Sequence, residues 1–137
     1  MRSTWRNTYW KHTSDKGYKP GNIDMAKIMI IGDMLCSPRM TEIANGDYGA
    51  LFAKANKLKN CDYLIGNLET PIAGEALKYT YERYRFNTPT AFLDAIKDCG
   101  FDMLTLANNH CMDRGEEGLF NTIQTCKEKG FDVIGAY

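Results

Sequence analysis

The stretch FDMLTLANNHCMDRGEEGLFNTIQTCKEKGFDVIGAY, residues 101–137, contains two short apolar runs separated by a segment with helical spacing. The runs at 101–108 and 131–137 have the length of buried strands. Between them, residues 115–130 begin with glutamates and end with lysines, as the dipole of a helix favours. A strand, a helix and a second strand in this order predict a parallel β-α-β unit.

The same alternation extends toward the N-terminus. KIMIIG (27–32) and DYLIGN (62–67) are two further apolar runs of strand length. Uninterrupted apolar strands that alternate with helices are typical of a sheet covered by helices. The sequence therefore predicts an α/β fold with a mainly parallel sheet of four strands.

Two more helices are predicted between these strands. Residues 47–60 have helical spacing with Asp47 as a plausible N-cap, and residues 88–100 have Thr88 as N-cap and a glycine as the stop. Residues 68–88 are irregular and rich in tyrosine, which indicates a small hairpin or a partly extended loop.

The length of the chain limits the number of domains, and its charge bears on the kind of partner that it binds. The chain has 137 residues and 44% hydrophobic residues, which suits one domain, assigned here to residues 26–137. Residues 1–25 are polar and are expected to form an N-terminal tail. Seventeen basic residues balance seventeen acidic ones, so a nucleic-acid partner is not expected.

No apolar run reaches the length of about 20 residues that spans a bilayer, and no signal peptide is recognisable. The five cysteines are irregularly spaced and form no CxxC pair, a pattern that favours reduced thiols over a disulfide framework. We therefore expect a cytoplasmic location for this chain, without a membrane segment.

Three of the four predicted strands end in polar residues that suit a divalent cation. The carboxyl ends of parallel strands share one edge of a sheet, so these side chains are expected to lie close together. Carboxylate, amide oxygen and imidazole are the donors of hydrolytic sites that hold Zn²⁺, Mn²⁺ or Fe. In strand order, the residues are Asp33; Asn67 and Glu69; and Asn108, Asn109, His110 and Asp113.

Ordinary structural roles remain open for each of these residues. Asp33 follows a glycine and suits a turn, and Glu69 suits a solvated loop. Asp113 is also a reasonable N-cap for the helix that begins near residue 115. The asparagines suit backbone bonds at strand ends, and His110 suits a hydrogen-bonded polar position. Their coincidence at one predicted edge is what favours a metal site.

Three blocks of the sequence resemble a known family. They are IIGDM (30–34), GNLETPI (66–72) and LTLANNHCMDRGEEGLFNTIQTCKEKGFDVIGA (104–136). The blocks are similar to the N-terminal half of the bacterial capsule synthesis protein CapA family. Its members are also described as poly-γ-glutamate biosynthesis proteins and belong to the calcineurin-like metallophosphatase superfamily. The long third block is the most specific of the three.

The resemblance implies a four-layer α/β/β/α sandwich with two divalent metal ions, such as Zn, Mn or Fe, at one sheet edge. It implies a hydrolase acting on a phosphoester or an amide bond of a polymer or small-molecule substrate. An imidazole suits proton transfer there, because its pKa lies near neutrality. The implied roles are metal ligation by Asp33, Glu69 and Asn109, support by Asn67 and Asn108, general acid or transition-state stabilisation by His110, and orientation of that imidazole by Asp113.

The sequence departs from the family pattern in one respect. Family sites are completed by histidines from the C-terminal half, including an HxH block, whereas the second histidine of this chain is His12 in the tail. We therefore expect a partial domain with an incomplete site that is inactive alone. A half-built sandwich should also leave apolar surface open to self-association.

Two other functions are weighed against the hydrolase. One is a non-enzymatic accessory or scaffold role in polymer synthesis or export. The other is a nucleotide-binding α/β protein, but the segment after the first predicted strand, GDMLCSPRM (32–40), lacks a glycine-rich phosphate loop.

Overall fold

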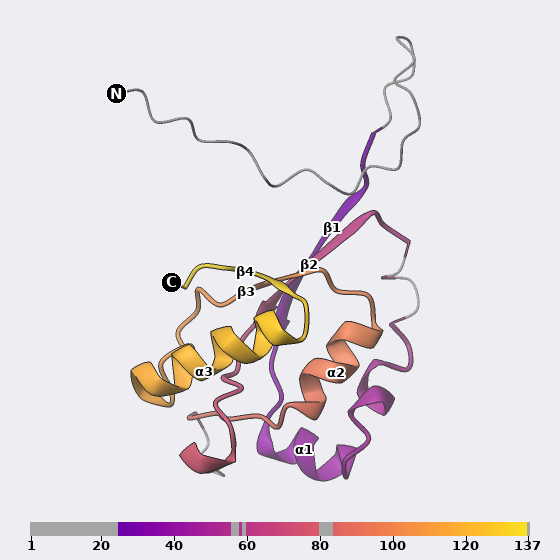
Figure 1. Ribbon diagram of the computed structural model, residues 1–137. Helices are drawn as coiled ribbons and strands as arrows, with labels where there is room; N and C mark the ends of the chain where they lie inside the picture. Colours follow the sequence, from indigo (N-terminus) through magenta and orange to yellow (C-terminus); the bar gives the residue numbers. More distant parts are fainter. Residues whose placement is uncertain (1–24, 56–57, 59, 80–83, 137) are drawn as a thin grey trace, which may run out of the picture.

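The computed structural model describes residues 25–55, 58, 60–79 and 84–136 (Figure 1). The predicted tail, residues 1–25, lies outside this part of the chain except for Met25. No helix within the described ranges has both the length and the apolar character needed to cross a membrane.

The strands of the described residues form one parallel sheet, as predicted. Its spatial order is β1-β2-β3-β4, the same as the order along the chain, and every neighbouring pair is parallel. The last two strands are shorter than the apolar runs that predicted them. The strands are β1 (Ile28–Met34), β2 (Tyr63–Leu68), β3 (Met103–Thr105) and β4 (Asp132–Ile134).

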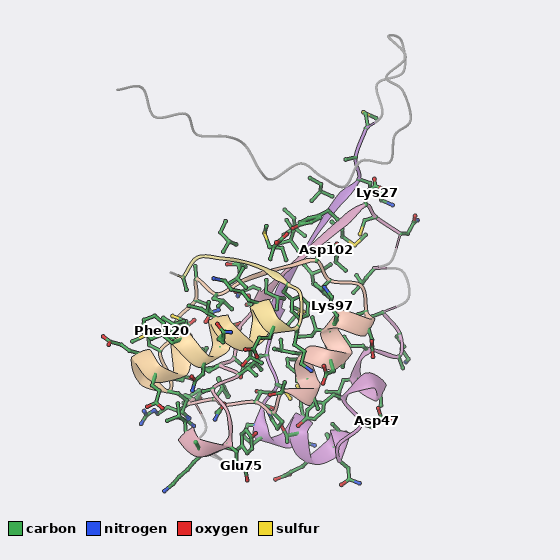
Figure 2. The ribbon with its side chains drawn as sticks, viewed as in Figure 1. Lys27, Asp47, Glu75, Lys97, Asp102 and Phe120 are labelled. Atoms are coloured by element: carbon green, nitrogen blue, oxygen red, sulfur yellow. The ribbon has the colours of Figure 1, made fainter. Side chains whose placement is uncertain are left out.

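The connections between strands contain the helices. The two longest, α2 and α3, lie on the same side of the sheet (Figure 1). Lys97 of α2, labelled in Figure 2, donates a hydrogen bond to Gly130 O at 2.7 Å and lies over the ring of Phe131. These two contacts link α2 to the turn after α3. The helical elements are α1 (Pro38–Ala44), η1 (Tyr48–Phe52), η3 (Glu75–Leu77), α2 (Ala91–Asp98) and α3 (Gly115–Glu128), of which η1 and η3 are 3₁₀ helices.

The helix predicted over 47–60 is wrong in extent and type. Among the described residues of this range, no α-helix forms and its start is the 3₁₀ helix η1, which Asp47 caps as predicted, accepting from Ala50 N at 3.2 Å. The rings of Tyr48 and Phe52 pack against Phe92 of α2, with centroids 6.0 and 5.8 Å apart. These contacts with α2 override the helical spacing of the segment.

Helix α1 is present where the sequence pattern gave no element. The Ser37 side chain accepts from Met40 N at 3.3 Å, and Pro38 occupies the first turn. Asn45 ends the helix in the left-handed region at φ 44°. Serine, proline and asparagine at these positions are ordinary start and stop signals, so α1 was predictable.

The cap predicted for α2 is also wrong. The N-cap is Thr90, whereas Thr88 is buried and its hydroxyl lies 2.7 Å from that of Thr70. The Thr88 hydroxyl also donates to Cys36 O at 3.3 Å. Thr88 therefore joins three loops in the interior. The helix stops before Gly100 at φ 90°, as predicted.

The two faces of the sheet differ in burial. Leu64, Leu68 and Leu104 face the helices and are at most 2% exposed. On the other face, Ile30 of β1 is 74% exposed and Ile134 of β4 is 54% exposed. Among the described residues, the core therefore lies between the sheet and the helices, and the opposite face of the sheet carries exposed apolar side chains.

Candidate functional site

The candidate site begins where β1 and β2 end side by side. Asp33 pairs in register with Asn67, directly after an irregularity in β1 between Ile31 and Asp33. A bulge of this kind changes the direction of a side chain at the end of a strand. Asn67 Nδ2 donates to Asp33 Oδ1 at 2.7 Å, so the two strand ends are joined through their side chains.

Asn108 extends this connection to the end of β3. Its Nδ2 donates to Asn67 Oδ1 at 3.1 Å and to Leu68 O at 2.9 Å. Its Oδ1 accepts from the backbone N–H of His110 at 3.0 Å. A continuous chain of hydrogen bonds therefore runs from Asp33 through two amides to the His110 loop.

Glu69 lies beside Asp33 at the same edge. Its backbone N–H donates to Met34 O at 3.1 Å, which places it directly after β2. Partial burial raises the pKa of the Glu69 carboxyl, and a hydrogen bond to Asp33 and the charge of Asp33 raise it further, while His110 opposes the shift. The carboxyl groups of Asp33 and Glu69 are thus close neighbours, and ionisation of both is opposed by the repulsion between their negative charges.

His110 and Asp113 form a side-chain pair in the loop after β3. His110 Nδ1 lies 2.9 Å from Asp113 Oδ2, and the side chains are 15% and 11% exposed. The alternative role of Asp113 as N-cap of α3 is wrong, because Arg114 occupies that position. An ionised carboxylate only accepts hydrogen bonds, so this contact places the imidazole proton on Nδ1.

Phe86 is a neighbour of this pair that the sequence pattern did not indicate. Its backbone N–H donates to Asp113 Oδ2 at 2.7 Å, and its ring lies edge-on to the His110 ring with centroids 4.6 Å apart. Two arginine side chains donate to Asp113 O, Arg85 at 3.3 Å and Arg114 at 2.9 Å. The segment before α2 therefore supports the loop after β3.

Asn109 is exposed on the same loop, next to His110. Among the described residues, no group of three or more histidine, cysteine, aspartate or glutamate side chains is placed to hold a metal ion. The oxygen donors of Asp33 and Glu69 nevertheless suit a hard cation, whose positive charge would offset both the burial and the neighbouring Asp33 carboxylate that raise the pKa of Glu69. The donor chemistry fits a divalent metal, with fewer charged ligands than a closed site has.

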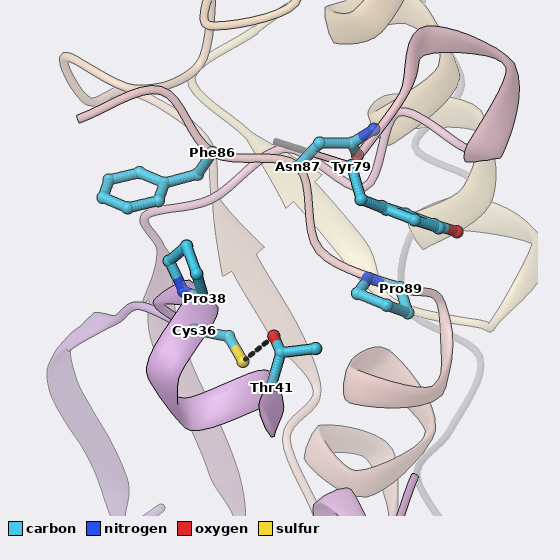
Figure 3. Close-up of a pocket in the computed structure, with 7 residues that line it drawn as sticks. All are labelled: Cys36, Pro38, Thr41, Tyr79, Phe86, Asn87 and Pro89. Carbon is cyan, nitrogen blue, oxygen red and sulfur yellow. Dashed lines mark hydrogen bonds between the residues drawn. The ribbon is translucent and has the colours of Figure 1, made fainter. Parts of the chain in front are cut away.

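A small pocket lies next to the site and shares Phe86 with it. Its volume is about 80 Å³, and Cys36 and Thr41 line it with their side chains 3.4 Å apart (Figure 3). Figure 3 shows Phe86 near Pro38 at one side of the pocket. Burial raises the pKa of the Cys36 thiol. The pocket is therefore a mainly apolar space with a protonated thiol.

Two curated proteins are similar to this chain. Capsule biosynthesis protein CapA of Bacillus anthracis is 35% identical over 114 residues, covering 78% of this chain and 27% of that protein. PGA biosynthesis protein CapA of Bacillus subtilis (strain 168) is 26% identical over 118 residues, covering 82% of this chain and 30% of that protein. The chain thus spans under a third of the length of these relatives.

The match to a family model covers the whole described sheet. Residues 27–137 match the model described as "Bacterial capsule synthesis protein PGA_cap". This range includes every residue of the candidate site, and it confirms the resemblance seen in the sequence. The chain belongs to the bacterial capsule synthesis protein PGA_cap family.

Proposed function

We propose that this chain contributes part of the active site of a metal-dependent hydrolase in capsule or poly-γ-glutamate biosynthesis. The observation that carries the proposal is the hydrogen-bonded chain from Asp33 through Asn67 and Asn108 to His110, which ends on Asp113. Family membership and the names of the two CapA relatives support the biological process. The bond that is cleaved is a phosphoester or an amide.

The proposed ligands of two divalent ions such as Zn, Mn or Fe are Asp33, Glu69 and Asn109, together with groups outside the described residues. Such ions act as Lewis acids that polarise a phosphoryl or carbonyl oxygen. Asn67 holds the Asp33 carboxylate by the 2.7 Å hydrogen bond, which fixes the direction of its free oxygen. Asn108 fixes the loop that presents Asn109.

His110 is the proton-handling group in this proposal. Asp113 accepts the hydrogen bond from Nδ1–H, which leaves Nε2 to give or take a proton at the reacting bond. The side chains of His110 and Asp113 are largely buried, so the imidazole is held in one orientation rather than sampling several. Asp113 is therefore a positioning residue for His110.

The alternative is a non-enzymatic accessory role in polymer synthesis or export. The observation that favours it is that the described residues bring fewer than three charged metal ligands together. In that case the hydrogen bonds between Asn67 and Asn108 have a structural role alone, which is to hold the ends of β2 and β3 next to each other.

Metal content and hydrolysis distinguish the two functions. The full-length protein that carries this sequence is purified as wild type, Asp33→Ala, His110→Ala and the control Asp94→Ala, an exposed carboxylate on α2. Metal content is measured by mass spectrometry, and hydrolysis is followed on an aryl phosphate and on a γ-glutamyl anilide.

We expect Asp33→Ala to lose metal and hydrolysis, and His110→Ala to keep metal while losing a factor of about 10²–10⁴ in rate. Asp94→Ala should behave as wild type. Full activity in both site variants would contradict the enzymatic assignment of these residues. A wild-type protein that binds no metal and cleaves neither substrate would favour the accessory role.

A further inference from the structure

Phe86 contacts the His110–Asp113 pair in two independent ways. It lies between η3 and α2, 27 residues before Asp113 in the chain. Phe86 is 5% exposed although residues 84–90 form neither helix nor strand. The buried ring packs against the imidazole of His110.

The backbone contact acts on Asp113. Asp113 Oδ2 accepts from Phe86 N at 2.7 Å and from His110 Nδ1 at 2.9 Å. One oxygen therefore receives two donors, and the position of the Phe86 backbone sets where this oxygen lies. Moving the backbone at Phe86 moves the acceptor that selects the imidazole tautomer.

The ring contact acts on His110 itself. The two rings meet edge to face, with centroids 4.6 Å apart and an interplanar angle of 60°. Edge-to-face contacts of this kind are a favoured arrangement of aromatic rings. The ring therefore opposes rotation of the imidazole away from Asp113.

Further contacts keep Phe86 in place. The side chain of the next residue, Asn87, is buried and accepts from Ala73 N at 2.9 Å and donates to Gly74 O at 2.8 Å. On the other side, Arg114 Nη2 donates to Arg85 O at 3.4 Å. The backbone on both sides of Phe86 is thus fixed by side-chain hydrogen bonds.

We propose that Phe86 is a positioning residue for His110, which holds the imidazole in the Nδ1–H tautomer by fixing Asp113 and by packing against the ring. The catalytic meaning of this role rests on the proposed function of His110 as the proton-handling group. The structural role itself is independent of any reaction.

Nitrogen-15 NMR of the 137-residue chain tests the proposal, because the chain has two histidines and His12→Gln assigns their signals. Spectra are recorded at one pH, about 8, above the ordinary pKa range of imidazole. The variants are Phe86→Leu, Phe86→Tyr, and the control Phe131→Leu, since Phe131 is 4% exposed and therefore matched in burial.

We expect His110 to be mainly in the Nδ1–H form in wild type and in Phe86→Tyr, which keeps the ring. In Phe86→Leu the Nδ1–H form should no longer dominate, whereas Phe131→Leu should keep it despite a similar loss of core packing. If Phe86→Leu does not fold, Phe86→Met replaces it, because methionine adapts to irregular space.

An unchanged His110 tautomer in a folded Phe86→Leu or Phe86→Met variant would overturn the proposal, as would an equal change in Phe131→Leu. The readout does not depend on hydrolysis. A chain in which Phe86 controls the tautomer but whose full-length protein cleaves nothing would retain this inference while contradicting the proposed function.

Discussion

Asp113 makes hydrogen bonds to two different segments of the chain through its carboxylate and its backbone carbonyl. Its carboxylate accepts from His110 and from the Phe86 backbone, and its own carbonyl accepts from two arginines. These contacts join the loop after β3 to the segment before α2. The residue is therefore structural and, in the proposed function, a positioning group for the imidazole.

Replacing Asp113 should reveal the structural part of this role. Asp113→Ala leaves Phe86 N and His110 Nδ1 without an acceptor in a largely buried place, and we expect it to lower the free energy of unfolding by about 1–3 kcal/mol. The control Asp94→Ala removes an ion pair to Lys129 whose Asp94 side chain is 52% exposed, and it should cost less than about 1 kcal/mol. Urea unfolding measures both, and equal losses would contradict the assignment.

The cysteines offer a second prediction, which depends on pH. Burial raises the pKa of the Cys126 thiol to about 12, so at pH 8 the thiolate fraction is about one in ten thousand, and it grows only as the pH approaches 12. Cys61 and Cys111 are partly exposed. Iodoacetamide at pH 8 should therefore modify Cys61 and Cys111 long before Cys126, as peptide mass mapping would show.

Denaturant supplies the control for this labelling. In unfolded protein all five cysteines should react at similar rates, because the burial that raises the pKa is lost. Labelling of Cys126 in the native protein as fast as Cys61 would show that the core around α3 is not closed.

At the scale of elements, helix α3 holds the loop after β2 through one hydroxyl. Thr122 Oγ1 accepts from Ile72 N at 2.9 Å and donates to Gly118 O at 2.7 Å, and Thr122 is 3% exposed. Thr125 makes the same kind of bond within the helix, to Asn121 O at 2.7 Å. The two threonines therefore differ in the contact to Ile72.

This pair gives a matched test of the docking of α3. Thr122→Val leaves the buried Ile72 N–H unsatisfied and should cost about 1–3 kcal/mol, whereas Thr125→Val should stay within about 0.5 kcal/mol of wild type. Thermal or urea unfolding of the two variants measures the difference. A loss in Thr125→Val as large as that in Thr122→Val would mean that the hydroxyl of Thr122 acts only within its helix.

The elements also show what the sequence could predict. The strands at 27–32 and 62–67 and the helix at 115–130 were predictable, because apolar runs and helical spacing report burial directly. Helix α1 carried its own start and stop signals at Ser37 and Asn45 and was missed because its apolar positions are few.

The support of the candidate site was harder to predict. The polar residues at the strand ends were predictable, because parallel strands bring them to one edge. Phe86 and Asp113 are in contact although they lie 27 positions apart in the sequence. The sequence around Phe86 shows neither helical nor strand-like spacing of apolar residues, so no pattern indicated where its side chain would lie. The interior role of Thr88 has the same cause, because its partner Thr70 lies in another loop.

At the scale of the whole molecule, the part of the chain that the structure describes covers one face of the sheet with helices and leaves apolar side chains exposed on the other. Ile28, Ile30 and Ile134 on the open face are 59%, 74% and 54% exposed. Exposed apolar groups on a sheet favour contacts between copies. We therefore expect the chain, studied alone, to self-associate as its concentration rises.

Light scattering coupled to gel filtration checks this expectation. Ile30→Thr keeps the strand preference of the position while removing apolar surface, and it should lower the apparent mass at high concentration. The control Phe120→Gln removes a ring on α3 that is 61% exposed and should leave association unchanged. A wild-type chain that stays monomeric at every concentration would contradict the expectation.

The proposed function requires that the edge formed by Asp33 and Glu69 holds a divalent metal. Equilibrium binding of Mn²⁺ to the full-length protein that carries this sequence tests this requirement, with Asp33→Asn as the site variant and Asp94→Asn as the surface control. Asparagine at position 33 retains an oxygen for the hydrogen bond from Asn67, so the network is kept while the charge is lost.

We expect wild type and Asp94→Asn to bind Mn²⁺ alike and Asp33→Asn to bind it at least about tenfold more weakly. Equal affinity of wild type and Asp33→Asn, or no binding of Mn²⁺ to the full-length wild type, would contradict the metal site.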